Sequence, residues 1–263
     1  MNYMDYLIGM PKQLMATMSF RVENVDTIFN FVLCMTLGYL LYMRSLKMIF
    51  REGTDPYPVQ LHTWMITIDS IGSVTFWLLA FKYRFFWMFV VMGIGLPIWV
   101  VMEAYSIYRA VKYNRAEEFK GLSHKTVTER VAWKYVLGMI FISFFINMWA
   151  LSMLGGLFNA AIFIIYPFTN YVFVFWTWRT WTTRGASKTR FGNSVALQWI
   201  ILIQVSVMWI PGLSWYTSVS PFFKEPWFYL AGIATSILAL YNLTSVSKLP
   251  KKASIINGHR SVW

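Results

Sequence analysis

The chain has 263 residues, of which 57% are hydrophobic and only 13% are charged. A soluble domain of this length carries about 25% charged residues, so the composition excludes an ordinary soluble protein and predicts a polytopic membrane protein. The net charge of +12 does not indicate a nucleic-acid partner, because the basic residues lie in short loops between apolar runs, where membrane topology accounts for them.

The first 26 residues lack a continuous apolar core, so we predict an interfacial segment rather than a cleavable signal peptide. Seven apolar runs follow, each close to the roughly 20 residues that a membrane helix needs. They cover residues 27–43, 61–81, 85–108, 131–150, 157–178, 194–213 and 226–246. Residues 247–263 then form a basic tail. We therefore expect an all-α polytopic membrane protein whose 263 residues make a single transmembrane domain embedded in the lipid bilayer.

The distribution of Lys and Arg predicts the orientation of these seven spans. Five of these residues fall on the side of the N-terminus, and eighteen fall on the side of the C-terminal tail. Cytoplasmic loops carry the excess of Lys and Arg. We expect the N-terminus outside or in the lumen and the C-terminus in the cytoplasm. The membrane would be the endoplasmic reticulum of a eukaryote or the inner membrane of a bacterium.

Metal and cofactor chemistry finds little support in the sequence. Cys34 is the single cysteine, and the three histidines are widely separated, so neither a disulfide nor a metal site is predicted. The chain has no Gly-rich phosphate loop, nucleophile elbow or Asp-rich diphosphate motif. The last apolar run has no lysine in its interior, which argues against a retinal Schiff base. We predict no cofactor.

Two acidic residues fall inside apolar runs and are the candidate catalytic residues. Asp69 lies eight residues into the second run, and Glu103 lies five residues before the end of the third. A charge at membrane depth costs about 2.5–3.5 kcal/mol on insertion scales, and such residues usually face the protein interior and serve function. Two carboxyl groups in unequal environments suit acid–base chemistry, because a carboxyl group in an apolar site holds and delivers a proton. The alternative is that each is a hydrogen-bonded structural residue.

Other polar and aromatic residues fall in the same, cytoplasmic half of the predicted spans. The candidate substrate-binding residues are Trp64, Trp99, Tyr166, Asn170, Gln204 and Asn242; His62 and Gln198 lie at similar depth. Their common depth favours one pocket open to the cytoplasmic leaflet, in which aromatic rings would stabilise a cation. The alternative is a set of independent interhelical hydrogen bonds.

Several segments resemble the small seven-helix terpene cyclases of fungal meroterpenoid and indole-diterpene pathways. The closest is the loop of residues 178–187, which reads WRTWTTRGAS, especially its part 183–187. The segment GYLLYMRS at 38–45 is similar to that family's first helix, and the spacing of Trp99 and Glu103 is similar to a Trp-to-acid spacing in its third. The chain departs from the family at Asp69, where an Asn followed by Trp-Glu is usual, and at Asn242, where the last helix usually carries an acid.

The resemblance implies a membrane-embedded cyclase that needs no metal and releases no diphosphate. A carboxylic acid, here Asp69 with Glu103 or Asn242 as its partner, would protonate an epoxide or alkene of a hydrophobic, prenylated substrate, and rings would close through carbocations. Two alternatives stay open. One is a small-solute transporter with three-one-three helices and a polar and aromatic midplane site. The other is a non-catalytic membrane subunit.

Overall fold

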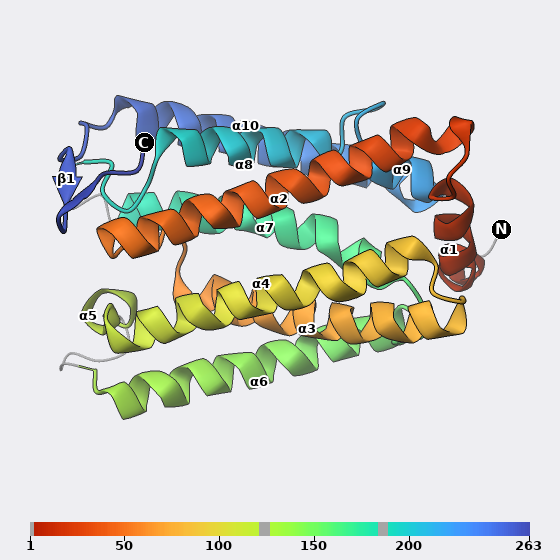
Figure 1. Cartoon of the computed structure of the whole chain (residues 1–263), viewed down its shortest axis with the longest axis horizontal. Helices are drawn as coiled ribbons and strands as arrows, with labels where there is room; N and C mark the ends of the chain where they lie inside the picture. The colour runs from red at the N-terminus through yellow and green to blue at the C-terminus, as the bar shows by residue number, and fades with distance from the viewer. Residues whose placement is uncertain (1–2, 121–126, 184–188) are drawn as a thin grey trace. The chain divides into compact units, whose positions relative to one another are not determined.

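The structure is a computed structural model that describes residues 3–120, 127–183 and 189–263. It is mostly helical, which confirms the expected α-helical class (Figure 1). The chain divides into two compact units, one formed by residues 57–162 and the other by residues 1–56 with 163–263.

The described part of the unit of residues 57–162 contains four helices. They are α3 (Val59–Lys82), α4 (Trp87–Lys112), α5 (Arg115–Glu118) and α6 (Glu129–Met153). α3 and α4 form an antiparallel hairpin, in which the rings of Phe76 and Phe89 stack 6.4 Å apart and the Ser73 hydroxyl donates to the Gly93 carbonyl at 3.2 Å. α6 packs against both helices. The short α5 closes one end, where the Glu118 carboxylate accepts from the Val59 backbone N–H at 3.3 Å.

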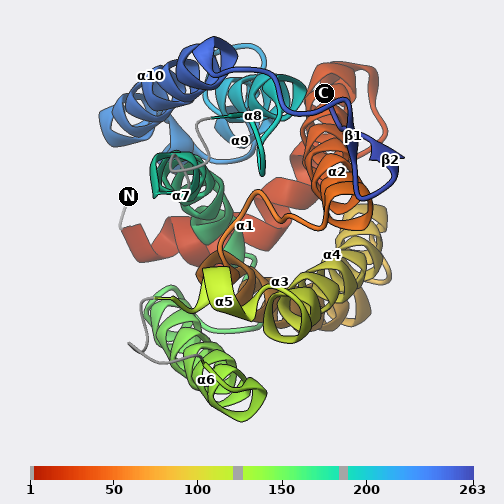
Figure 2. The ribbon, with the colours of Figure 1, turned by 90° about the vertical axis from the view of Figure 1, so that its left-hand side faces the viewer.

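The second unit contains the remaining elements. The boundary between the units falls after Ile162, the first residue of α7, so the rest of that helix belongs to the second unit. These are α1 (Tyr3–Thr17), η1 (Val22–Asn24), α2 (Val25–Glu52), α7 (Ile162–Thr183), α8 (Val195–Val207), α9 (Trp215–Val219), η3 (Pro221–Lys224), α10 (Pro226–Lys248), β1 (Ile255–Ile256) and β2 (His259–Arg260). α8 packs against both α2 and α10, as Figure 2 shows. Near one end, the Trp215 ring is 5.2 Å from Phe31 and 5.5 Å from Phe163, which ties α2, α7 and α9 together.

Five helical segments are long and apolar enough to cross a membrane: Val22–Glu52, Val59–Lys82, Trp87–Lys112, Glu129–Met153 and Pro226–Lys248. The apolar helices Ile162–Thr177 and Val195–Val207 are shorter. These findings support a protein embedded in a membrane. Each of the seven predicted runs overlaps one of these seven segments, although the run predicted at 157–178 begins too early, since α7 begins at Ile162. The number of helices that cross the bilayer and their orientation stay predictions.

The run expected at 194–213 differs from the structure, because α8 ends at Val207. Proline restricts the preceding residue and lacks a backbone N–H, and Pro211 is followed by Gly212 with φ +82°. The helix therefore does not continue through this segment. The interrupted backbone is satisfied by side chains: Asn30 donates to the Gly212 carbonyl at 2.9 Å, and the Ser214 hydroxyl donates to the Met208 carbonyl.

The segments predicted as an interfacial stretch and a basic tail both contain regular secondary structure that packs on the rest of their unit. In the first, α1 packs against α9 and buries Met10 and Leu14 completely. In the second, β1 and β2 form an antiparallel hairpin. Its turn is Asn257-Gly258, with φ of 50° and 76°, and two central residues with positive φ are typical of the tight turns that Asn-Gly favours.

Candidate functional site

A buried pair of titratable side chains lies between α3 and α4. His62, in the first turn of α3, hydrogen-bonds through Nδ1 to Oε2 of Glu103 on α4. The two side chains are only 4% and 1% exposed. The antiparallel hairpin brings residues 41 positions apart to the same level, just as it aligns Phe76 with Phe89 further along. Glu103 therefore has a partner that its own helix does not supply.

Asp69 lies deeper along α3 and is completely buried. It follows His62 by seven residues, which is two helical turns on one face and about 10 Å along the axis. Neither carboxyl oxygen of Asp69 has a hydrogen-bond partner in the part of the chain that the structure describes. Among the described residues, Asp69 therefore differs from Glu103, whose carboxylate is hydrogen-bonded to His62.

Further polar contacts join α3 to α6 beside these residues. The Asn147 amide donates to the Thr67 hydroxyl at 3.0 Å, and both side chains are buried. One end of α3 carries a second contact, in which the Gln60 amide donates to the Tyr135 hydroxyl at 3.2 Å. The polar groups therefore extend along α3 on the side facing its neighbours within this unit.

The predicted aromatic residues of this unit have different surroundings. Trp99 is 9% exposed and precedes Glu103 by four residues, so it lies one turn away on the same face of α4. Trp64 is half-buried on α3. It follows His62 by only two residues, which places it on a different face of the helix. Of the two rings, Trp99 is the one beside the titratable group.

The other four predicted site residues lie in the second unit, where three of them make separate hydrogen bonds. Asn170 donates to the Tyr166 carbonyl of its own helix at 2.9 Å. Gln204 donates to Cys34 Sγ at 3.6 Å, and Asn242 donates to the Val174 carbonyl at 3.2 Å. The bonds of Gln204 and Asn242 join different helices and match the alternative of independent interhelical hydrogen bonds, whereas the bond of Asn170 lies within α7. One pocket shared by all eight predicted residues stays a prediction, because they divide between two units.

Sequence reasoning missed two parts of this site. His62 is predicted only to lie at a similar depth, and Asn147 is not among the predicted site residues. The spacing of seven between His62 and Asp69 was the available signal, since residues two turns apart share a helix face. Of the loop that carries the family resemblance, residues 184–187 lie outside the described part of the chain.

Comparisons with known proteins add no relative. No protein-family model matches the chain, and neither a curated protein nor a solved structure matches it. The resemblance to terpene cyclases therefore stays a prediction, and any functional argument rests on the residues of this chain.

Proposed function

We propose that this protein is a membrane-embedded cyclase that protonates an epoxide or alkene of a hydrophobic, prenylated substrate. Its chain would cross the membrane seven times, with the N-terminus outside or in the lumen and the C-terminus in the cytoplasm. The observation that carries the proposal is Asp69, a completely buried carboxyl group without a hydrogen-bond partner among the described residues. We assign it the role of proton donor.

The environment of Asp69 suits an acid. Burying an ionised group without a partner costs several kcal/mol even after relaxation, so a carboxyl group in this position is suited to hold its proton until a basic atom arrives. Glu103 is different, because His62 hydrogen-bonds to it. Two titratable centres with different surroundings are the arrangement that separates an acid from a base.

The proposed reaction is an isomerisation. The Asp69 carboxyl proton passes to the epoxide oxygen, whose C–O bond opens to give an alcohol and a carbocation, or to an alkene carbon. The π electrons of a neighbouring alkene then form a C–C bond with the cation, and the ring closes. The final cation loses a proton to the Glu103–His62 pair, and that proton returns to Asp69. Substrate and product therefore have the same mass.

Trp99 supports the same chemistry. Its ring lies one helical turn from Glu103 and is largely buried. A cation over the face of a tryptophan is stabilised by about 2 kcal/mol or more when water is excluded. In the proposed mechanism Trp99 stabilises the carbocation before its proton is lost.

Proton-coupled transport of a small solute is the second candidate. It is favoured by the different depths of the titratable groups along α3, since chains of Asp, Glu and His within membrane helices are typical of proton relays. Asp69 would then bind and release a proton during transport, and no substrate would change chemically.

A product assay on membranes that contain the protein tests both candidates. Wild type, Asp69→Asn and the control Asp26→Asn are incubated with farnesyl- and geranylgeranyl-bearing aromatic compounds, with and without a terminal epoxide. Asp26 is an exposed carboxylate in the first turn of α2. We expect a new product of unchanged mass from wild type and from Asp26→Asn, and at least 100-fold less from Asp69→Asn, the usual range for loss of a general acid.

Absence of any isomer from folded wild-type protein would refute the cyclase. Proton-driven uptake of a radiolabelled solute into proteoliposomes, lost in Asp69→Asn, would then support transport. If Asp69→Asn makes as much isomer as Asp26→Asn, the enzyme class stands and the assignment of Asp69 is wrong.

A further inference from the structure

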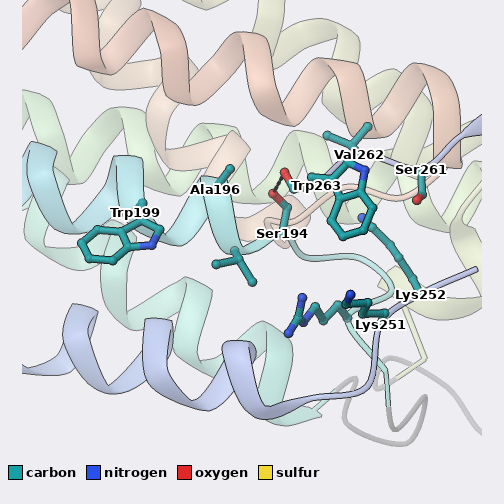
Figure 3. Close-up of a pocket in the computed structure, with 10 residues that line it drawn as sticks. Ser194, Ala196, Trp199, Lys251, Lys252, Ser261, Val262 and Trp263 are labelled. Carbon is teal, nitrogen blue, oxygen red and sulfur yellow. Dashed lines mark hydrogen bonds between the residues drawn. The ribbon is translucent and has the colours of Figure 1, made fainter. Parts of the chain in front are cut away.

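A cavity of about 270 Å³ lies at the start of α8, within the unit that contains both chain ends (Figure 3). Its walls come from two segments far apart in sequence: residues 190–199, which precede and begin α8, and residues 251–263 after α10. The lining side chains labelled in Figure 3 include Ser194, Ala196, Trp199, Lys251, Lys252 and Trp263. The folding back of the C-terminal hairpin therefore creates this cavity.

The hairpin is held in place by a buried ion pair at Glu52, the last residue of α2. Lys252 Nζ lies 2.7 Å from Glu52 Oε1 and donates to the Asn193 carbonyl at 3.0 Å. The same carboxylate accepts from the Val262 backbone N–H. Burial lowers the pKa of Lys252, although the hydrogen bond and charge of Glu52 act in the opposite direction. The positive charge of Lys252 is thus matched by an acid outside the cavity lining.

Two further cations of the lining are not matched in this way. Arg190 donates through Nε to the Val246 carbonyl at 3.1 Å, an uncharged acceptor, and Lys251 lies 5.6 Å from the centroid of the Trp263 ring. No Asp or Glu is among the ten described residues that line the cavity. The side chains of the described lining therefore carry more positive than negative charge.

The rest of the lining is apolar. Val195, Ala196 and Trp199 lie along α8, and Val262 and Trp263 face them from the tail. Trp199 is 51% exposed, and it lies one turn beyond Val195 toward the middle of the apolar helix. The cavity thus has cations at one end and an apolar path, formed by Ala196 and Trp199 of α8, at the other. These features match a ligand with an anionic head and a hydrocarbon chain.

We propose that this cavity binds an anionic membrane phospholipid, with its phosphate beside Arg190 and Lys251 and its acyl chain along the α8 residues Ala196 and Trp199. Basic pockets at helix ends bind phosphate headgroups, and Trp is enriched at membrane interfaces. The apolar span of α10 ends at Lys248, just before Lys251, which places the cavity where a headgroup is available. This proposal does not depend on the catalytic one.

Native mass spectrometry of the detergent-purified protein tests the proposal. Binding of phosphatidylglycerol is compared with that of phosphatidylcholine of the same chains, with and without millimolar inorganic phosphate. The variants are Lys251→Gln, which removes one unmatched charge, and Ala196→Phe, which fills the apolar path. Lys248→Gln is the control, since Lys248 is exposed and does not line the cavity. Thermal unfolding of each variant confirms that it is folded.

We expect wild type to prefer phosphatidylglycerol at least fivefold. Lys251→Gln should weaken its binding about fivefold, the effect of one lysine near an anionic headgroup. Ala196→Phe should weaken it about tenfold, whereas Lys248→Gln should change it less than twofold. Equal binding of both lipids, or full binding by folded Lys251→Gln, would overturn the proposal. Displacement of the lipid by inorganic phosphate would also overturn it, because the site would then recognise a free anion.

Discussion

The buried residues His62, Glu103 and Asp69 differ in what their removal leaves behind. His62 Nδ1 and Glu103 Oε2 are hydrogen-bonded to each other, so loss of one side chain removes the hydrogen-bond partner of a buried polar atom on the other. Asp69 has no hydrogen-bond partner among the described residues, so its replacement by a neutral side chain leaves no other buried group without its hydrogen-bond partner. Stability and function should therefore respond differently at these positions.

We expect Glu103→Leu to lower the free energy of unfolding by about 3 kcal/mol, the cost of breaking a buried pair by removing one partner. Asp69→Asn should change it by less than about 1 kcal/mol, because no hydrogen bond to this carboxyl group is lost. Denaturant unfolding of the purified protein in mixed micelles measures both values. A larger loss in Asp69→Asn than in Glu103→Leu would contradict this division of roles.

Sequence reasoning found Asp69 and Glu103 because an ionisable residue inside an apolar run is conspicuous. It could not find the pairing of Glu103 with His62. That contact depends on the length of the turn between α3 and α4 and on the rotation of each helix, and neither is set by local composition. For the same reason, the hydrogen-bond partners of Asn170, Gln204 and Asn242 in the other unit could not be predicted from the sequence.

At the scale of helices, glycine sets how closely two of them approach. A Cβ atom added to Gly232 of α10 would lie 2.2 Å from Cγ of Trp209, which follows α8. The Trp209 indole in turn donates to Ser236 of α10 at 2.9 Å. The ring therefore lies directly on the backbone of α10, and only a residue without a side chain fits beneath it.

We expect Gly232→Ala to destabilise the protein by about 1–3 kcal/mol, the usual cost of overpacking. Gly138 of α6 is a matched control, because a Cβ atom added there would meet no atom within 4 Å. Gly138→Ala should stabilise the protein by about 0.5–1 kcal/mol, since alanine favours a helix interior over glycine. Thermal unfolding of the two variants in the same detergent gives the comparison, and equal shifts would contradict the close approach.

The tail hairpin is an element whose stability depends on one carboxylate. Glu52→Gln should release it, because the pair with Lys252 is lost and the Lys252 ammonium is left without its counter-ion. Amide exchange of residues 255–263 should become at least tenfold faster, a shift of about 1.4 kcal/mol in the local opening equilibrium. Glu23→Gln, at an exposed residue, should leave it unchanged. Unaltered exchange in Glu52→Gln would show that Glu52 does not hold the hairpin.

The prediction of helices was most successful where apolar runs are long and uninterrupted. The failures have local causes: Pro211 and Gly212 end the helix that was expected to reach residue 213, and Asn257-Gly258 turns a segment expected to be a simple basic tail into a hairpin. Both signals are present in the sequence. Their effect depends on tertiary partners, Asn30 in the first case and Glu52 in the second.

At the scale of the whole molecule, the proposed orientation makes a labelling prediction. In a Cys34→Ala background, new cysteines at Arg84 and Lys224 should react with a membrane-impermeant maleimide added outside intact cells. Cysteines at Lys120 and Ser254 should react only after the membrane is opened. Labelling of Ser254→Cys from outside would reverse the orientation, and labelling of Arg84→Cys and Lys120→Cys from the same side would exclude a membrane crossing between them.

In the proposed topology, in which α8 crosses the bilayer, the early end of this helix has a consequence for the thickness of the surrounding lipid. Its 13 residues span about 20 Å, whereas a typical hydrocarbon core is about 30 Å thick. A short apolar element is accommodated by local thinning of the lipid, at a cost of a fraction of a kcal/mol per ångström. We therefore expect the protein to be more thermostable in vesicles of 14-carbon phosphatidylcholine than in those of 22-carbon phosphatidylcholine. Hydrophobic mismatch at this one helix would then favour residence in thinner membranes.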